Sequence, residues 1–182
     1  RKVQTTRMRV RGVVIERTSQ IVLVDTPGIF EPKRNLDKAM VDAAWAGAAD
    51  ADLVCLIIDA PELLRDPDGL SARDTARIIR GLKDAGRSAI LVVNKVDAVK
   101  RDQLLPLVDR YRAETKFDEV FMISAEKGDG TADLVHYLAS QVPEGPSAYP
   151  EDQASAIPPR LPAAATTRAS WCAVAAGRHR PA

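Results

Sequence analysis

Four consecutive residues near the middle of the chain have the chemistry to recognise a purine base. Asn94-Lys95-Val96-Asp97 directly follows the apolar run 89–93, a pattern typical of a buried strand. An ionised Asp97 can accept hydrogen bonds from adjacent N–H and NH₂ donors, a pair that guanine offers and adenine does not. Lys95 could lay its stem along the base or ribose, and Asn94 could join neighbouring loops. The motif predicts a guanine site; the alternative is a strand-to-helix connection capped by Asp97.

A second short motif follows the next apolar run. Ser124 and Ala125 come directly after Ile123, and Ser124 lies 30 positions beyond Asn94. The Ala125 N–H can point at the guanine O6, and Ser124 can brace its loop against Asp97. Ser-Ala alone carries almost no information. Its position at the next strand end supports guanine as the base.

Asp25-Thr26-Pro27-Gly28 has the chemistry to contact a metal ion and a phosphate. Asp25 at a strand end can hold a Mg²⁺-bound water, and the Gly28 N–H can bind a γ-phosphate while the loop pivots. An ordinary Pro-Gly turn is the alternative. Together with the guanine motif, these four residues predict a nucleoside triphosphate as the ligand.

Gln4-Thr5-Thr6-Arg7 precedes the first predicted strand and resembles a phosphate-sensing switch. A threonine hydroxyl in such a switch ligates Mg²⁺ while its backbone senses the γ-phosphate. Thr5 and Thr6 are both candidate ligands, and the sequence does not choose between them. The alternative is a polar, basic N-terminal arm.

No catalytic residue can be assigned from the sequence. Ile29 follows Gly28, at a position where Ras-type enzymes place a water-orienting glutamine. An isoleucine cannot orient water, so slow intrinsic hydrolysis is predicted. His136 lies in a predicted helix and His179 in the C-terminal tail, and neither is expected to act in catalysis.

The elements that must position these motifs alternate between strands and helices. Predicted strands cover 10–16, 20–24, 53–58, 89–93 and 119–123, and predicted helices cover 35–49, 71–85, 101–114 and 131–141, with a loop at 59–69 and Gly86 as a helix cap. This alternation predicts an α/β fold with a mostly parallel sheet and helices on both faces. Ligands of such folds bind at the carboxyl ends of the strands, where three of the motifs are expected to meet.

Composition narrows the class of protein and separates the domain from its tail. A formal charge of +1 gives no whole-chain field for nucleic-acid or membrane binding, and two cysteines, Cys55 and Cys172, favour a reducing compartment. No apolar run reaches the length of a membrane span.

We expect a domain over 1–142, a Pro/Gly-rich linker over 143–155, and a tail over 156–182 without regular structure.

The combination QTTR, DTPG, NKVD and ISA resembles the translation-factor-related GTPases, and within them the Era family of bacterial ribosome-assembly GTPases. Gly28-Ile29-Phe30, residues 123–127 and the junction 143–153 add to a resemblance that covers about residues 1–155. It implies a three-layer P-loop NTPase-type fold and slow hydrolysis of GTP to GDP with Mg²⁺. It also implies binding of 16S ribosomal RNA and the 30S subunit through a KH domain. A cytoplasmic location with peripheral inner-membrane contact is implied as well.

The sequence departs from the family pattern at two places. It contains no G-x-x-x-x-G-K-[ST] motif, and residues 156–182 contain no G-x-x-G. We therefore expect a truncated domain with the first strand and phosphate loop missing, and a disordered or frameshifted tail in place of the KH domain. The alternatives are a non-catalytic guanine-nucleotide-binding remnant and another translation-factor-related GTPase.

Overall fold

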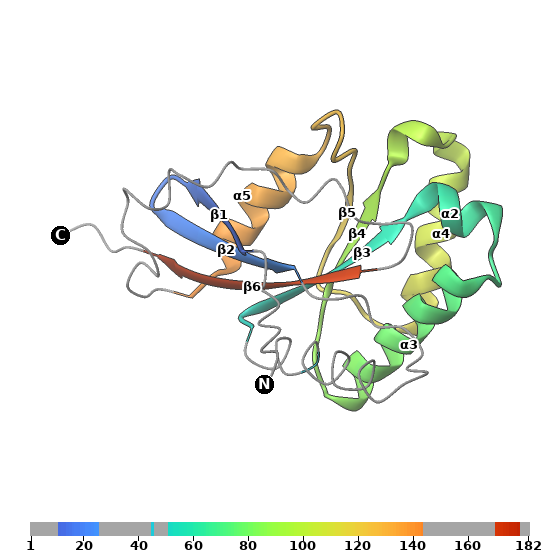
Figure 1. Cartoon of the computed structure of the whole chain (residues 1–182), viewed down its shortest axis with the longest axis horizontal. Coiled ribbons are helices and arrows are strands. Elements are labelled where there is room, and N and C mark those ends of the chain that lie inside the picture. Colours follow the sequence, from blue (N-terminus) through green and yellow to red (C-terminus); the bar gives the residue numbers. More distant parts are fainter. Residues whose placement is uncertain (1–10, 26–44, 46–50, 144–169, 179–182) are drawn as a thin grey trace, which may run out of the picture.

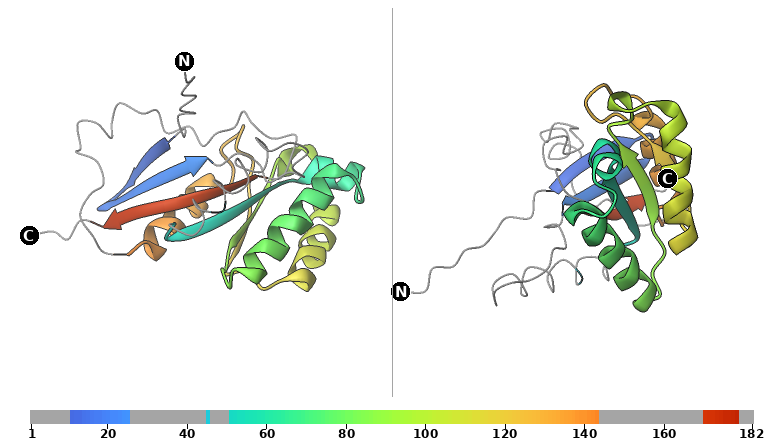
Figure 2. Two further views of the ribbon diagram at one scale, coloured as in Figure 1. Left: turned by 60° about the horizontal axis from the view of Figure 1, so that its bottom comes forward. Right: turned by 90° about the vertical axis from the view of Figure 1, so that its right-hand side faces the viewer.

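The computed structural model describes residues 11–25, 45, 51–143 and 170–178. Within these ranges the strands form one six-stranded sheet in the order β1-β2-β6-β3-β4-β5 (Figure 1). Helices lie on both faces of this sheet, which the two views of Figure 2 make plain. The predicted α/β architecture is confirmed.

An antiparallel hairpin forms one edge of the sheet. Strands β1 (Arg11–Glu16) and β2 (Ser19–Asp25) are joined by a two-residue turn. Arg17 has a φ of 54° there, in the left-handed region that short hairpin turns favour. The strands predicted at 10–16 and 20–24 correspond to β1 and β2.

The other half of the sheet is parallel. Strand β3 (Leu53–Asp59) pairs with β4 (Ile90–Asn94), which pairs with β5 (Val120–Met122), all in the same direction. Helix α3 (Leu70–Asp84) lies in the connection from β3 to β4, and α4 (Arg101–Glu114) lies in the connection from β4 to β5. Helix α5 (Thr131–Gln141) follows β5. A short 3-10 turn, η1 (Val96–Ala98), follows β4. The carboxyl ends of β4 and β5 therefore meet at one edge.

Each face of the parallel strands is covered by a different set of helices. Leu56 and Ile58 are fully buried in the core that contains α3 and α4, whereas Cys55 is buried in the core that contains α5. A strand covered on both faces has a continuous apolar sequence, and the prediction of a buried strand at 53–58 rests on that pattern. Among the described residues, no helix combines the length and apolar character needed to cross a bilayer.

A short helix occupies part of the segment predicted as a loop. Helix α2 (Ala60–Arg65) begins directly after β3, and the Asp59 side chain accepts a hydrogen bond from the Glu62 N–H at 3.1 Å. Pro61 in the first turn suits the helical φ. The prediction of a loop over 59–69 is wrong in this part. Asp59 with Glu62 three residues later is a helix-start pattern that identifies α2 in the sequence.

The last described segment is a strand inside the sheet. Strand β6 (Ser170–Arg178) lies between β2 and β3 and is antiparallel to both (Figure 1). The prediction of no regular structure over 156–182 is wrong for these nine residues. A strand with a partner on each side satisfies its backbone groups through pairings that are distant in sequence, so its local pattern is a weak signal.

Some predicted segments lie wholly or partly outside the described residues. The predicted helix 35–49 is described only at Trp45, which is helical, and the predicted linker 143–155 only at Pro143. The described helices end at Gln141, close to the predicted domain boundary at 142. That boundary stays a prediction.

Candidate functional site

Three buried polar residues lie where β3, β4 and β5 end. Asp59 pairs with Asn94 across the two parallel strands, and Ser124 follows β5 by two residues. Asp59, Asn94 and Ser124 are 5%, 8% and 0% exposed. Burying polar groups costs free energy unless they are hydrogen-bonded, so the partners of these three residues show how the edge is built.

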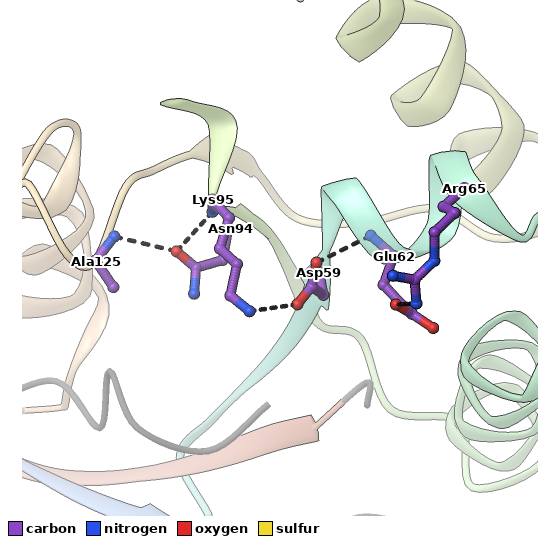
Figure 3. A network of polar contacts seen from close by, with 6 residues as sticks. All are labelled: Asp59, Glu62, Arg65, Asn94, Lys95 and Ala125. Carbon is purple, nitrogen blue, oxygen red and sulfur yellow. Dashed lines mark hydrogen bonds and ion pairs between the residues drawn. The ribbon is translucent and has the colours of Figure 1, made fainter. Parts of the chain in front are cut away.

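Asn94 joins the β4 and β5 loops. Its side-chain oxygen accepts a hydrogen bond from the Lys95 N–H at 2.8 Å and another from the Ala125 N–H at 3.1 Å (Figure 3). A third bond, from the Val96 N–H to the Ile123 carbonyl at 3.2 Å, runs parallel to this bridge. One amide side chain thus fixes the two loops relative to each other.

Lys95 is held in an unusual backbone conformation. Its φ is 63° and its ψ is 37°, the left-handed region that residues with a Cβ rarely adopt. Its ammonium lies 2.6 Å from Asp59 Oδ2, and its side chain is 43% exposed (Figure 3). The ammonium therefore points along the sheet edge toward the end of β3, and part of the stem remains open to solvent.

Asp97 lies on η1 with its side chain 19% exposed and its carboxylate 3.3 Å from the Lys127 ammonium. A hydrogen bond from the Ser124 side chain holds the pKa of Asp97 below its ordinary value, and Lys127 lowers that pKa further against an opposing effect of burial. Asp97 is consequently ionised at neutral pH. An ionised carboxylate is the form that can accept two hydrogen bonds.

The Ser124 loop is shaped by its own hydrogen bonds. The Ser124 hydroxyl accepts the Lys127 N–H at 3.2 Å, and the Ser124 carbonyl accepts the Gly128 N–H at 2.8 Å. These contacts keep Ser124 and Lys127 on the side of the loop that faces Asp97. The loop and the β4 turn form one connected unit.

The Ala125 N–H differs from the sequence expectation. We expect it to point at a guanine O6, but in this structure it donates to Asn94 at 3.1 Å. A guanine oxygen at that position would have to share the donor with Asn94 or replace it.

Asp25 does not reach the edge where the other motifs meet. It pairs with Cys172 on β6, and Cys172 pairs with Cys55 on β3. Asp59 lies four residues further along β3 than Cys55, which corresponds to roughly 13 Å of strand. Asp25 itself therefore lies short of the strand ends that carry Asp59 and Asn94. Whether its motif meets the Asn94 motif stays a prediction, because Thr26, Pro27 and Gly28 lie outside the described residues.

The remaining residues of the predicted phosphate and switch motifs lie outside the described residues. These are Thr26, Pro27 and Gly28 of the first motif, and Gln4, Thr5, Thr6 and Arg7 of the second. Their roles stay predictions. Within the described part, the structure assembles only the half of the predicted site that would bind the base.

Comparison with known proteins assigns the family. A family model described as "50S ribosome-binding GTPase" matches residues 1–95, half of the chain. This chain belongs to that GTPase family.

Relatives of this GTPase chain include Era proteins of several bacteria. GTPase Era of a Bradyrhizobium species (strain BTAi1) is 54% identical over 168 residues, which cover 92% of this chain and 52% of the relative. GTPase Era of Caulobacter vibrioides (strain NA1000 / CB15N) is 51% identical over 174 residues, covering 92% of this chain and 55% of the relative. The chain thus spans about half the length of these relatives, and its predicted resemblance to Era is confirmed.

A solved Era structure also matches the fold. It is a crystal structure of an Aquifex aeolicus Era variant bound to GDP·AlF₄⁻, with a TM-score of 0.67 and 36% sequence identity. The match covers 81% of this GTPase chain and 48% of that chain. The predicted P-loop NTPase-type fold class is confirmed by this match.

Sequence reasoning missed two charged residues of this GTPase site. Asp59 pairs with Lys95, and Lys127 pairs with Asp97. Asp59 ends an apolar strand beside the predicted site, and that position was a usable signal for it. Lys127 contributed to the resemblance only as part of residues 123–127, and a site role was not predicted for it because a lysine in an exposed loop is most often solvated.

An open pocket of about 500 Å³ lies beside η1 but does not coincide with the predicted base site. It is lined by α2, η1 and the start of α4, and includes Pro61, Leu64, Asp97 and Gln103. Asp97 is its one residue from the predicted nucleotide-binding set. The hydrogen bonds around Asn94, and not this pocket, therefore define the candidate base site.

Proposed function

We propose that this chain is the guanine-binding part of an Era-like GTPase, whose full-length protein binds GTP and hydrolyses it slowly. The observation that carries the proposal is the joined edge of β4 and β5. Asn94 bridges the two loops, and a hydrogen bond from Ser124 lowers the pKa of the neighbouring Asp97. A fixed carboxylate beside an open lysine stem is the arrangement that recognises the N1–H and NH₂ edge of guanine.

Fixing these groups before the ligand arrives favours binding. The Asn94 bridge and the Ser124 hydroxyl set the positions of two loops that would otherwise lose conformational freedom on binding. Preorganisation of this kind raises affinity by lowering the ordering cost. Discrimination against adenine follows because an adenine edge would leave the Asp97 carboxylate without donors.

Competition between nucleotides tests the proposed base preference. GDP, inosine diphosphate and ADP share their phosphates and differ at the base edge, so binding to this chain is measured for all three by equilibrium dialysis. We expect GDP to bind most tightly, inosine diphosphate roughly ten- to a hundredfold more weakly because it lacks one donor, and ADP weakest. Equal binding of GDP and ADP would contradict the assignment.

Hydrolysis of GTP would require groups beyond those that contact the base. Mg²⁺ belongs to the proposed reaction, with Asp25 through water and Thr5 or Thr6 as predicted ligands. Among the described residues, no group of three or more His, Cys, Asp or Glu side chains is placed to hold a metal ion. The predicted ligands Thr5 and Thr6 lie outside the described residues, so the Mg²⁺ proposal rests on the resemblance.

A guanine-nucleotide-binding chain without hydrolysis is a second candidate function. The observation that favours it is the position of Asp25, four residues of strand short of the edge that carries Asn94. Single-turnover measurement of phosphate release from GTP with Mg²⁺ separates the two. Phosphate release above the buffer rate supports the GTPase, whereas binding of GTP without release supports the second candidate.

We further propose that the ribosome is the partner of the full-length protein. The matching family is described by binding to the 50S ribosome, whereas the resemblance to Era implies 16S RNA and the 30S subunit. Co-sedimentation of the full-length protein with purified 30S and 50S subunits tests which is bound. A cytoplasmic location with peripheral inner-membrane contact stays a prediction from the resemblance, and fractionation of cells tests it.

A further inference from the structure

Asp59 is a buried acid with both carboxylate oxygens engaged. Its Oδ1 accepts the Glu62 N–H at 3.1 Å, which caps α2, and its Oδ2 accepts a hydrogen bond from the Lys95 ammonium at 2.6 Å (Figure 3). The residue is only 5% exposed. It belongs neither to the predicted base-reading motif nor to the predicted phosphate motifs.

The two partners of Asp59 differ in how firmly they are fixed. The Glu62 N–H is part of the helix backbone, so the cap fixes the carboxylate in place. The Lys95 side chain is long and 43% exposed, so holding its ammonium in one place costs rotamer entropy. The rigid partner therefore determines where the flexible one lies: Asp59 sets the position of the Lys95 ammonium.

Lys95 is thereby held from two sides. Its N–H donates to Asn94 while its ammonium is bound to Asp59, and the stem spans the gap between the ends of β4 and β3. A lysine stem fixed at both ends presents a defined apolar surface next to Asp97. A stem fixed at one end would sample many rotamers instead.

We propose that Asp59 is a positioning residue of the guanine site, which orders the Lys95 stem as a wall for the base and so raises the affinity for guanine nucleotide. This inference rests on the proposed function. Asp59 acts through Lys95 and does not itself touch the nucleotide. The Lys95 side chain then loses its conformational entropy when the chain folds, so this loss does not oppose nucleotide binding.

Asp59→Asn tests this role without removing the helix cap, because an asparagine oxygen can still accept the Glu62 N–H. It replaces the charged partner of Lys95 by a neutral one. We expect GDP to bind roughly three- to tenfold more weakly, with the melting temperature nearly unchanged. Glu62→Ala is the matched control: it removes the surface pair with Arg65 but leaves Asp59 and Lys95 intact. We expect it to bind GDP as the parent does.

Coupling to Lys95 distinguishes positioning from a general structural effect. Lys95→Met keeps an apolar stem and removes the ammonium. If Asp59 acts through that ammonium, adding Asp59→Asn to Lys95→Met weakens GDP binding no further. Additive losses in the double variant, or unchanged GDP affinity in Asp59→Asn alone, would overturn the proposal.

A nucleotide-free measurement separates this inference from the proposed function. In the ¹⁵N NMR spectrum of the free chain, a hydrogen-bonded Lys95 ammonium is expected to be protected from exchange, and Asp59→Asn is expected to abolish that signal while Glu62→Ala preserves it. A chain that keeps the signal but binds no GDP refutes the proposed function and upholds the anchoring by Asp59. Equal Lys95 signals in the parent and Asp59→Asn would refute the anchoring itself.

Discussion

At the scale of single residues, the charge of Asp97 determines what the site can recognise. A protonated carboxyl group would present a donor of its own and could not accept both guanine N–H groups. The Ser124 hydrogen bond lowers the pKa of Asp97 first of all, and Lys127 lowers it further. Both partners come from the loop after β5, so the proposed guanine site involves two loops and not the Asn94–Asp97 motif alone.

The lowered pKa of Asp97 predicts how base preference varies with pH. Because this pKa lies below the ordinary value of 3.8, the carboxylate stays ionised at every pH above that value, and its contribution is lost only as pH falls through the lowered pKa. We expect the ratio of GDP to ADP affinity to be constant between pH 8 and pH 5. The ratio is used because both ligands carry the same phosphates, whose own titration then cancels. A GDP-to-ADP affinity ratio that falls with a midpoint near pH 6 would show that another titratable group controls the base preference.

At the scale of single elements, the turn before α5 fixes the loop that holds Ser124. Gly130 has a φ of 70°, and a Cβ at this position would lie 2.5 Å from the Met122 carbonyl oxygen. Gly128 has a φ of 84°, but a Cβ there would meet only Thr131 Oγ1 at 4.0 Å. Both glycines therefore adopt a left-handed backbone conformation, but of the two only Gly130 also has no room for a Cβ.

This difference makes the two glycines a matched pair of substitutions. We expect Gly128→Ala to lower the free energy of unfolding by about 1 kcal/mol through the left-handed backbone alone. Gly130→Ala is expected to cost clearly more, because backbone oxygen must also move away from the new Cβ. Urea unfolding followed by circular dichroism measures both. Equal losses in the free energy of unfolding would mean that the backbone around residue 130 can move away from the new Cβ without cost.

Strand β6 gives a second prediction at the scale of elements. Val174 pairs with Leu23 on β2 and with Leu53 on β3, whereas Arg178 pairs only with Ser19 at the end of the ladder. Proline has no N–H to donate and is poorly tolerated in a central strand. We expect Val174→Pro to lower the free energy of unfolding by about 1–3 kcal/mol, as for an unmet buried hydrogen bond, and Arg178→Pro to have a smaller effect. A Val174→Pro chain as stable as its parent would show that β6 is not part of the sheet.

The elements differ in how well the sequence predicts them. Strand β3 and helix α4 were recoverable because a strand buried on both faces is continuously apolar, and because a 14-residue helix is long enough to show its period. Strand β6 was not, because its stability comes from pairing with residues more than a hundred positions away. The same holds for the Asp59–Lys95 pair, which joins residues 36 positions apart. Local patterns predict the residues of the proposed guanine site, while only the fold shows what holds them in place.

At the scale of the whole molecule, the described residues bring together the polar groups of the proposed guanine site. The ends of β3, β4 and β5 bring Asp59, Asn94 and Ser124 to one edge, and these residues fix Lys95 and Asp97. The chain spans about half the length of its Era relatives, and the residues predicted to contact phosphate and Mg²⁺ are not assembled at this edge by the described part. Guanine recognition is therefore the claim about this chain that its structure supports most directly.

The most direct test exchanges the base preference by altering Asp97. Xanthine differs from guanine in carrying a carbonyl where guanine carries its NH₂ group, so its edge offers one donor and one acceptor. Asp97→Asn presents one acceptor and one donor in return and complements xanthine instead of guanine. The measurement is the affinity of the parent and Asp97→Asn chains for GDP and for xanthosine diphosphate. The account predicts that the parent prefers GDP and that Asp97→Asn prefers xanthosine diphosphate, with each preference about tenfold or more. The same GDP preference in both chains would contradict the assignment of Asp97 as the residue that reads the base.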